Sequence, residues 1–173
     1  MSASRRPDLD MIAHSPEQTR AIAALLGRRL AAGDLVLLRG GLGMGKTTFI
    51  QGLARGLGVR DSVTSPTFTL VMEHAVDEEA DSPATRFYHV DLYRLEHGAE
   101  EALAFGLEEY LLDEDAVTAI EWPEHAAEAL PDEYLLVELR PLADTKRRLL
   151  LSPQGTRYRA LIDALRPEVS GHG

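Results

Sequence analysis

A glycine-rich segment, Gly40 to Thr47, ends in a lysine and a threonine and matches the pattern G-x-x-x-x-G-K-[ST] in full. Glycines let such a loop curl until its backbone N–H groups point inward, where they hold phosphate groups. Lys46 would reach the β and γ phosphates of a nucleoside triphosphate, and the Thr47 hydroxyl would ligate Mg²⁺. Nucleotide contacts are therefore expected from Leu42, Gly43, Met44, Gly45, Lys46, Thr47 and Thr48.

The alternative interpretation of this loop is a flexible glycine turn that binds nothing. The distribution of basic residues argues against it. The chain has 18 lysines and arginines, of which only Lys46 and Lys146 are lysines, and one of these two stands at the position that the phosphate pattern requires.

Two apolar runs further along the chain each end in a carboxylate. Asp91 follows residues 87–90, and Glu121 follows residues 117–120. Phosphoryl transfer needs acids at the ends of strands beside the phosphate loop, to hold Mg²⁺ and to position the attacking water. Asp91 and Glu121 are therefore, with Lys46, the candidate catalytic residues. The alternative for each acid is a solvated strand end.

A polar segment, residues 63–68, follows the helix that the phosphate loop begins. Phosphate-loop enzymes often place a mobile switch at this point, and a hydroxyl such as that of Thr67 could sense the γ phosphate. The alternative is a turn that only joins two elements. His89 is expected to be a packed histidine rather than a proton carrier, so it is not counted among the catalytic residues.

Hydrophobic periodicity and turn residues predict the elements that hold these side chains. Ser15 caps a helix that ends at Gly33, and the apolar run 35–38 is typical of a strand buried on both faces. A second helix is predicted over residues 46–57, with Gly58 as its stop. Further strands are predicted over residues 67–73, 85–92, 116–120, 134–139 and 147–151, and further helices over 99–112, interrupted at Gly106, and 156–165.

The order of strand, glycine loop and helix predicts an α/β fold. We expect a single P-loop NTPase-like domain with a parallel central sheet, antiparallel additions from two hairpins, and helices on both faces. The ATPase domain is expected over residues 15–166, between a flexible N-terminus, residues 1–14, and a flexible tail, residues 167–173.

The composition excludes several classes of protein. With 28 acidic and 18 basic residues the net charge is −10, which argues against direct binding of tRNA or other nucleic acid. The chain contains no Asn, so it lacks the Asn-Lys-x-Asp tetrad that reads guanine, and ATP is favoured over GTP. It has no Cys, which excludes disulfides and thiolate metal sites, and no apolar run long enough to span a bilayer. A cytoplasmic protein is expected.

Five stretches resemble, in family order, the motifs of the bacterial TsaE (YjeE-like) family: GGLGMGKTT, SPTFTLV, YHVDLYRL, GLEEYL, and EWPEH followed by LP. The resemblance covers about residues 15–155. It implies a small ATPase that binds ATP and Mg²⁺ and supports formation of threonylcarbamoyladenosine at position 37 of tRNAs that read ANN codons. It also implies two partner proteins, TsaB and TsaD, which carry the transfer step.

The resemblance assigns roles to individual residues. It implies that Thr47 and Glu121 ligate Mg²⁺, that Asp91 assists hydrolysis, that residues 65–68 act as a switch, and that Thr19 contacts the nucleotide. One position departs from the family pattern, because Gly41 stands where an acidic residue is usual. We expect this glycine to alter the rigidity of the loop rather than to abolish binding.

Two other functions stay open on the sequence. One is a small-molecule kinase, in which Lys146, Arg147 and Arg148 would form a lid that stabilises phosphate. The other is a nucleotide-gated assembly factor, in which binding of ATP rather than its turnover regulates a partner complex.

Overall fold

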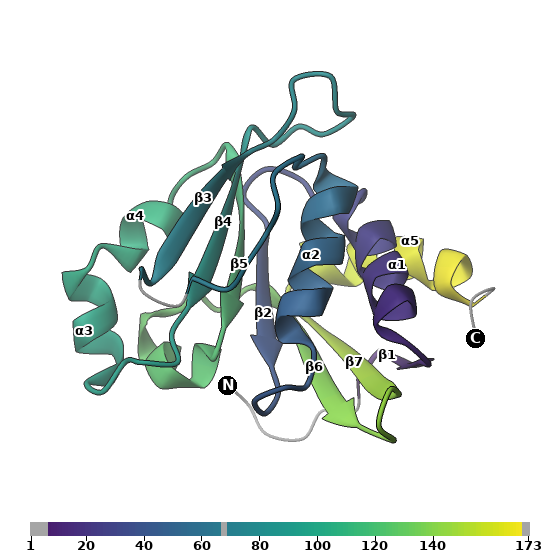
Figure 1. Ribbon diagram of the computed structural model, residues 1–173. Coiled ribbons are helices and arrows are strands. Elements are labelled where there is room, and N and C mark those ends of the chain that lie inside the picture. The colour runs from purple at the N-terminus through teal and green to yellow at the C-terminus, as the bar shows by residue number, and fades with distance from the viewer. Residues whose placement is uncertain (1–6, 67–68, 171–173) are drawn as a thin grey trace.

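The computed structural model describes residues 7–66 and 69–170, which form a seven-stranded sheet with helices on both sides (Figure 1). The strand order is β1-β7-β6-β2-β5-β4-β3. The strands are β1 (Leu9–Ala13), β2 (Leu35–Arg39), β3 (Val71–Ala75), β4 (Arg86–Asp91), β5 (Ala116–Glu121), β6 (Tyr134–Pro141) and β7 (Arg147–Gln154). The helices are α1 (Pro16–Gly27), α2 (Lys46–Leu57), α3 (Gly98–Ala104), α4 (Leu107–Leu111), the 3₁₀ helix η1 (Pro123–Ala129) and α5 (Thr156–Val169).

The centre of the sheet is parallel and its edges are antiparallel. Parallel pairs join β6 to β2, β2 to β5 and β5 to β4, whereas β3 pairs antiparallel with β4, β7 with β6, and β1 with β7. β2 is buried over its first four residues, as its continuous apolar sequence predicts for a central strand. The expected fold class is confirmed, including both hairpins.

Two apolar clusters cover the two faces of the sheet. α1, α2 and α5 pack with Val36, Leu38 and Ala119 on one face. α3, α4 and η1 pack with Leu35, Leu37 and Ile120 on the other. Alternate residues of each strand therefore face different helices, and every second residue of β4 and β5 faces α2.

The boundaries of the folded region differ from those predicted. The sequence predicts a flexible N-terminus over residues 1–14, but residues 9–13 form β1 and pair with β7, and Leu9 and Ala13 are buried. At the other end α5 continues past residue 166 to Val169, which is buried in the core. The prediction was wrong at both ends because the anchoring contacts come from β7 and the core, which local sequence does not reveal.

The first helix also ends earlier than predicted. Ser15 caps α1 by accepting a hydrogen bond from the backbone N–H of Gln18, as expected, but the helix ends at Gly27 rather than at Gly33. Gly33 lies instead in the turn before β2, where its φ of +91° suits glycine. No helix among the described residues combines the length and the apolar character needed to cross a membrane.

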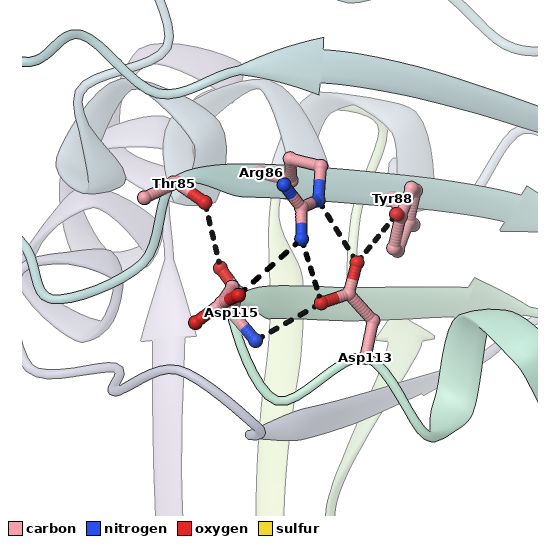
Figure 2. Close-up of polar contacts among 5 residues, drawn as sticks. All are labelled: Thr85, Arg86, Tyr88, Asp113 and Asp115. Carbon is pink, nitrogen blue, oxygen red and sulfur yellow. Dashed lines mark hydrogen bonds and ion pairs between the residues drawn. The ribbon is translucent and has the colours of Figure 1, made fainter.

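A polar network joins the beginnings of β4 and β5 (Figure 2). Arg86 donates two hydrogen bonds of 2.9 Å to Asp113, and the Tyr88 hydroxyl donates to the same carboxylate at 2.6 Å. These bonds hold the pKa of Asp113 well below its usual range, while burial and the bond to Asp113 raise the pKa of Tyr88 to about 12. The network ties the segment before β5 to β4 and so supports the register that the far ends of these strands share.

Candidate functional site

The phosphate loop joins β2 to α2 and borders a cavity of about 520 Å³. Gly43 and Gly45 adopt positive φ angles of 73° and 96°, a conformation that a side chain would strain. Gly45 is the N-cap of α2, which places the positive end of the helix at the loop. The cavity is lined by residues 41–48 together with Ser65, Pro66, Leu70, Asp91, Tyr93, Arg94, Glu121 and Trp122.

Lys46 is buried, with only 5 % of its surface exposed. Its ammonium donates to the carbonyl oxygens of Gly40 and, at 3.0 Å, of Gly41, and lies 4.0 Å from the centre of the Trp122 ring. Burial lowers the pKa of Lys46, and the nearby carboxylates oppose this shift. The ammonium can exchange its bonds to the loop for bonds to phosphate oxygens, which carry more negative charge than a carbonyl.

Asp91 and Glu121 end neighbouring parallel strands and are direct partners in the register of β4 and β5. Glu121 is also paired with Leu38 of β2, the strand that leads into the phosphate loop. Both carboxylates line the cavity, so the structure brings the predicted catalytic residues Lys46, Asp91 and Glu121 together. Asp91 accepts hydrogen bonds from the Ser65 hydroxyl at 3.2 Å and from the Tyr93 backbone N–H at 3.0 Å.

The side-chain oxygen atoms at this edge of the sheet suit a magnesium ion that is shared with a nucleotide. Mg²⁺ takes one or two protein oxygens and completes its octahedron with phosphates and water. Thr47 and Glu121 line the same cavity and can supply such ligands. In the part of the chain that the structure describes, no three His, Cys, Asp or Glu side chains form a cluster that could hold a metal alone.

Two residues of this site were not identified from the sequence. His89 was expected to be packed, and it is fully buried, but its Nε2 also lies 2.7 Å from Oε2 of Glu121. Its position two residues before Asp91 places both on one strand face, which was the available signal. Trp122 has a φ of +57° and is the one non-glycine residue with a positive φ among those described. Its ring contacts the Lys46 ammonium.

Residues 63–65, between α2 and β3, are connected both to α2 and to the carboxylate of Asp91. The side-chain amide of Gln51 on α2 donates to the carbonyl of Val63 at 3.0 Å, and Ser65 donates to Asp91. Ser65 and Pro66 line the cavity, whereas Thr67, the predicted phosphate sensor, lies outside the described residues.

Other predicted residues lie elsewhere. Thr19 is buried in the first turns of α1 and does not line the cavity. Arg147 donates to the carbonyl of Met44 in the phosphate loop at 3.2 Å and to carbonyls of its own turn, while Arg148 pairs with Asp10 of β1. Neighbouring residues of β7 point to opposite faces, so Arg147 and Arg148 do not form a common lid with the exposed Lys146.

The sequence is similar to proteins of one family. The family model described as threonylcarbamoyl adenosine biosynthesis protein TsaE matches residues 13–149. A Bacillus subtilis protein, named tRNA threonylcarbamoyladenosine biosynthesis protein TsaE, is 37 % identical over 151 residues, which cover 87 % of this chain and 89 % of the relative. A protein of the same name from Streptomyces coelicolor is 45 % identical over 125 residues, 69 % of this chain and 80 % of the relative.

A solved structure shows the same fold. The crystal structure of Bacillus subtilis YdiB superposes with a TM-score of 0.77 at 32 % sequence identity, and the alignment covers 95 % of this chain and 99 % of that one. The family model, the relatives and the shared fold all cover most of the chain, and on these grounds the chain belongs to the TsaE family.

Proposed function

We propose that this chain is a Mg²⁺-dependent ATPase that supports the formation of threonylcarbamoyladenosine at position 37 of tRNAs that read ANN codons. The proposal places it in the cytoplasm with the TsaB and TsaD proteins as partners. The names of its relatives support the pathway. The observation that carries the ATPase is the meeting of the phosphate loop, Asp91 and Glu121 in one cavity at the carboxyl edge of parallel strands.

In this proposal each group has a defined task. The backbone N–H groups of the loop bind the phosphates, and Lys46 leaves the carbonyls of Gly40 and Gly41 to meet the β and γ phosphates. Thr47 and Glu121 hold Mg²⁺, which neutralises the charge that develops on the phosphate oxygens when it is bound. Asp91 orients the attacking water and accepts its proton.

A nucleotide-gated assembly factor is the second candidate, and one observation favours it. Each oxygen of Asp91 already accepts a hydrogen bond from the chain, one from Ser65 and one from Tyr93. In this arrangement Asp91 is restrained, so the isolated protein would bind ATP without turning it over quickly.

Phosphate release measured with and without the TsaB and TsaD proteins tests the proposal. We expect slow release by the isolated chain, a marked increase in the presence of both partners, and no release by the Lys46→Ala variant in either case. ATP-dependent binding to the partners without any phosphate release would favour the assembly factor. Fast release that the partners leave unchanged would contradict a partner-dependent ATPase.

A further inference from the structure

We propose that His89 is a positioning residue that orients the Glu121 carboxylate for Mg²⁺. This inference rests on the proposed function, because it concerns the metal that the nucleotide brings. It assigns a task to a side chain that the phosphate-loop pattern does not contain. His89 itself touches neither nucleotide nor metal in this proposal.

The sheet brings the two side chains together. Asp91 and Glu121 are register partners, and His89 is paired with Ala119 two residues earlier on the same two strands. Because residues two apart share a strand face, His89 and Glu121 lie on the face that α2 covers. Ala119 has a small side chain, which leaves room for the imidazole to reach diagonally to Glu121, where Nε2 lies 2.7 Å from Oε2.

Burial makes this hydrogen bond important for both partners. His89 is 0 % exposed and Glu121 is 4 % exposed, so little water reaches either group. A buried carboxylate without a donor pays a desolvation penalty, and a hydrogen bond to it contributes more than one between neutral groups. The bond occupies Oε2 and leaves Oε1 of Glu121 as the oxygen for a metal.

The proton on the imidazole can be assigned from its surroundings. Nδ1 of His89 is buried and has no hydrogen-bond partner among the described residues. An N–H placed there would lack an acceptor, whereas an N–H on Nε2 has the Glu121 carboxylate in front of it. His89 therefore donates through Nε2 and fixes one rotamer of the Glu121 side chain. Residues that do not touch the metal themselves orient other metal-binding carboxylates by hydrogen bonds in the same way.

The sequence offers a matched control for this residue. His74, on the neighbouring strand β3, is also buried, at 4 % exposed, and its ring stacks on Phe87. Nδ1 of His74 lies 3.6 Å from Oδ2 of Asp61, its acidic neighbour. His74 does not line the cavity. Replacing His74 thus perturbs sheet packing to a similar degree without touching Glu121.

The test measures the Mg²⁺ concentration needed for ATP binding, read from the fluorescence of Trp122, the one tryptophan of the chain. His89→Leu removes the donor, His89→Gln returns an amide N–H near the position of Nε2, and His89→Asn places its amide one bond short. We expect His89→Leu and His89→Asn to raise the half-maximal Mg²⁺ concentration roughly 10-fold or more, and His89→Gln and His74→Leu to stay close to the wild type. Circular dichroism confirms that each variant is folded.

Three outcomes would overturn the inference. The first is a folded His89→Leu with the Mg²⁺ requirement of the wild type. The second is an equal rise for His74→Leu, which would mean that the effect comes from sheet packing. The third, which decides the matter even if His89→Leu does not fold, is the same Mg²⁺ requirement for His89→Asn and His89→Gln. A wild type that binds ATP without any Mg²⁺ dependence would contradict the proposed function itself, and this result is distinct from the other three.

Discussion

The charged side chains of the site are held by hydrogen bonds to other groups of the chain. Lys46 donates to two loop carbonyls and lies against Trp122, and Asp91 accepts from Ser65 and Tyr93. These bonds give the buried Lys46 and the half-buried Asp91 hydrogen-bond partners, which can be exchanged when phosphate groups enter.

Removing the Lys46 ammonium should weaken ATP binding sharply. In the proposed mechanism its ammonium contacts the terminal phosphates in a buried site. Such a contact is worth on the order of 3 kcal/mol, which corresponds to roughly a 150-fold loss of affinity in Lys46→Ala. Isothermal titration calorimetry measures this loss. The control is Lys146→Ala, which removes the other lysine from an exposed turn and should leave the affinity unchanged. Equal affinity of Lys46→Ala and wild type would refute the phosphate-loop assignment.

The two carboxylates should differ in the kind of defect that they cause. In the proposed mechanism Glu121 is a metal ligand and Asp91 orients the attacking water. Glu121→Gln should therefore raise the Mg²⁺ concentration needed for ATP binding, while saturation can still be read from the fluorescence of Trp122. Asp91→Asn should bind MgATP normally and slow phosphate release, because only the water-orienting group is lost. Mg²⁺ titrations and single-turnover assays separate these effects. If Asp91→Asn instead shows the raised Mg²⁺ requirement, the two roles must be exchanged.

Residues 63–65, which lie between α2 and β3, connect the helix of the phosphate loop with the end of β4. Gln51 donates to the carbonyl of Val63 and Ser65 donates to Asp91, so these residues are tied both to α2 and to the end of β4. The network of Arg86 and Asp113 acts at the opposite ends of β4 and β5, where it supports their register (Figure 2).

Releasing Asp91 from Ser65 should increase the basal activity of the isolated chain. In Ser65→Ala the carboxylate loses one hydrogen bond, so phosphate release should rise roughly 2- to 10-fold, the range that the loss of one such bond corresponds to. A phosphate-release assay without partners measures the change. Ser62→Ala, an exposed position on the same segment, should have no effect. A slower Ser65→Ala would show that the hydroxyl assists hydrolysis rather than restraining Asp91.

The contribution of Asp113 to stability should decrease in acid. Its folded-state pKa is lowered by the bonds from Arg86 and Tyr88, so the unfolded state binds a proton first as the pH falls below about 4. The stabilisation is therefore complete at neutral pH and is lost toward the lower, folded-state pKa. Urea unfolding at pH 7 and at pH 3 should show a difference between wild type and Asp113→Asn that is smaller in acid.

Asp115→Asn is the matched control for this prediction. Its carboxylate is 3.6 Å from the Arg86 guanidinium and its side chain is 71 % exposed, so solvent screens the interaction. We expect a small effect with little pH dependence. A difference for Asp113→Asn that stays constant between pH 7 and pH 3 would contradict the linkage.

Across the whole molecule, the excess of acidic residues argues against direct recognition of tRNA. The chain carries a net charge of −10, and 13 of its 28 acidic residues lie between residues 74 and 115. This region includes α3 and α4, on the side of the sheet opposite α1 and α2 (Figure 1). An acidic surface repels the phosphate backbone of RNA.

The isolated chain should therefore not bind tRNA. Fluorescence anisotropy with labelled tRNA is expected to show no binding at micromolar protein, even at low salt, where electrostatic attraction would be strongest. The same titration in the presence of the TsaB and TsaD proteins provides the comparison. Tight binding by the chain alone, weakened by added salt, would contradict this prediction.

Local patterns in the sequence were sufficient for the phosphate loop and for most elements. The glycine spacing and the Lys-Thr pair identify the phosphate loop directly. The bounds of α2, residues 46–57, depend on interactions within a few residues, so they can be predicted without knowledge of the fold. The same holds for the interruption at Gly106, whose φ is +92°. The apolar runs also placed Asp91 and Glu121 at strand ends.

Only the tertiary structure decided which distant residues meet. The register of β4 and β5 places Asp91 beside Glu121 and brings His89 within 2.7 Å of the Glu121 carboxylate. Residues 9–13 form β1 because they pair with β7. Each of these contacts joins segments far apart in the chain, and its free energy depends on which strands are neighbours. A strand's own sequence specifies that it is extended and which face is apolar, but the burial of side chains on both partners selects the pairing.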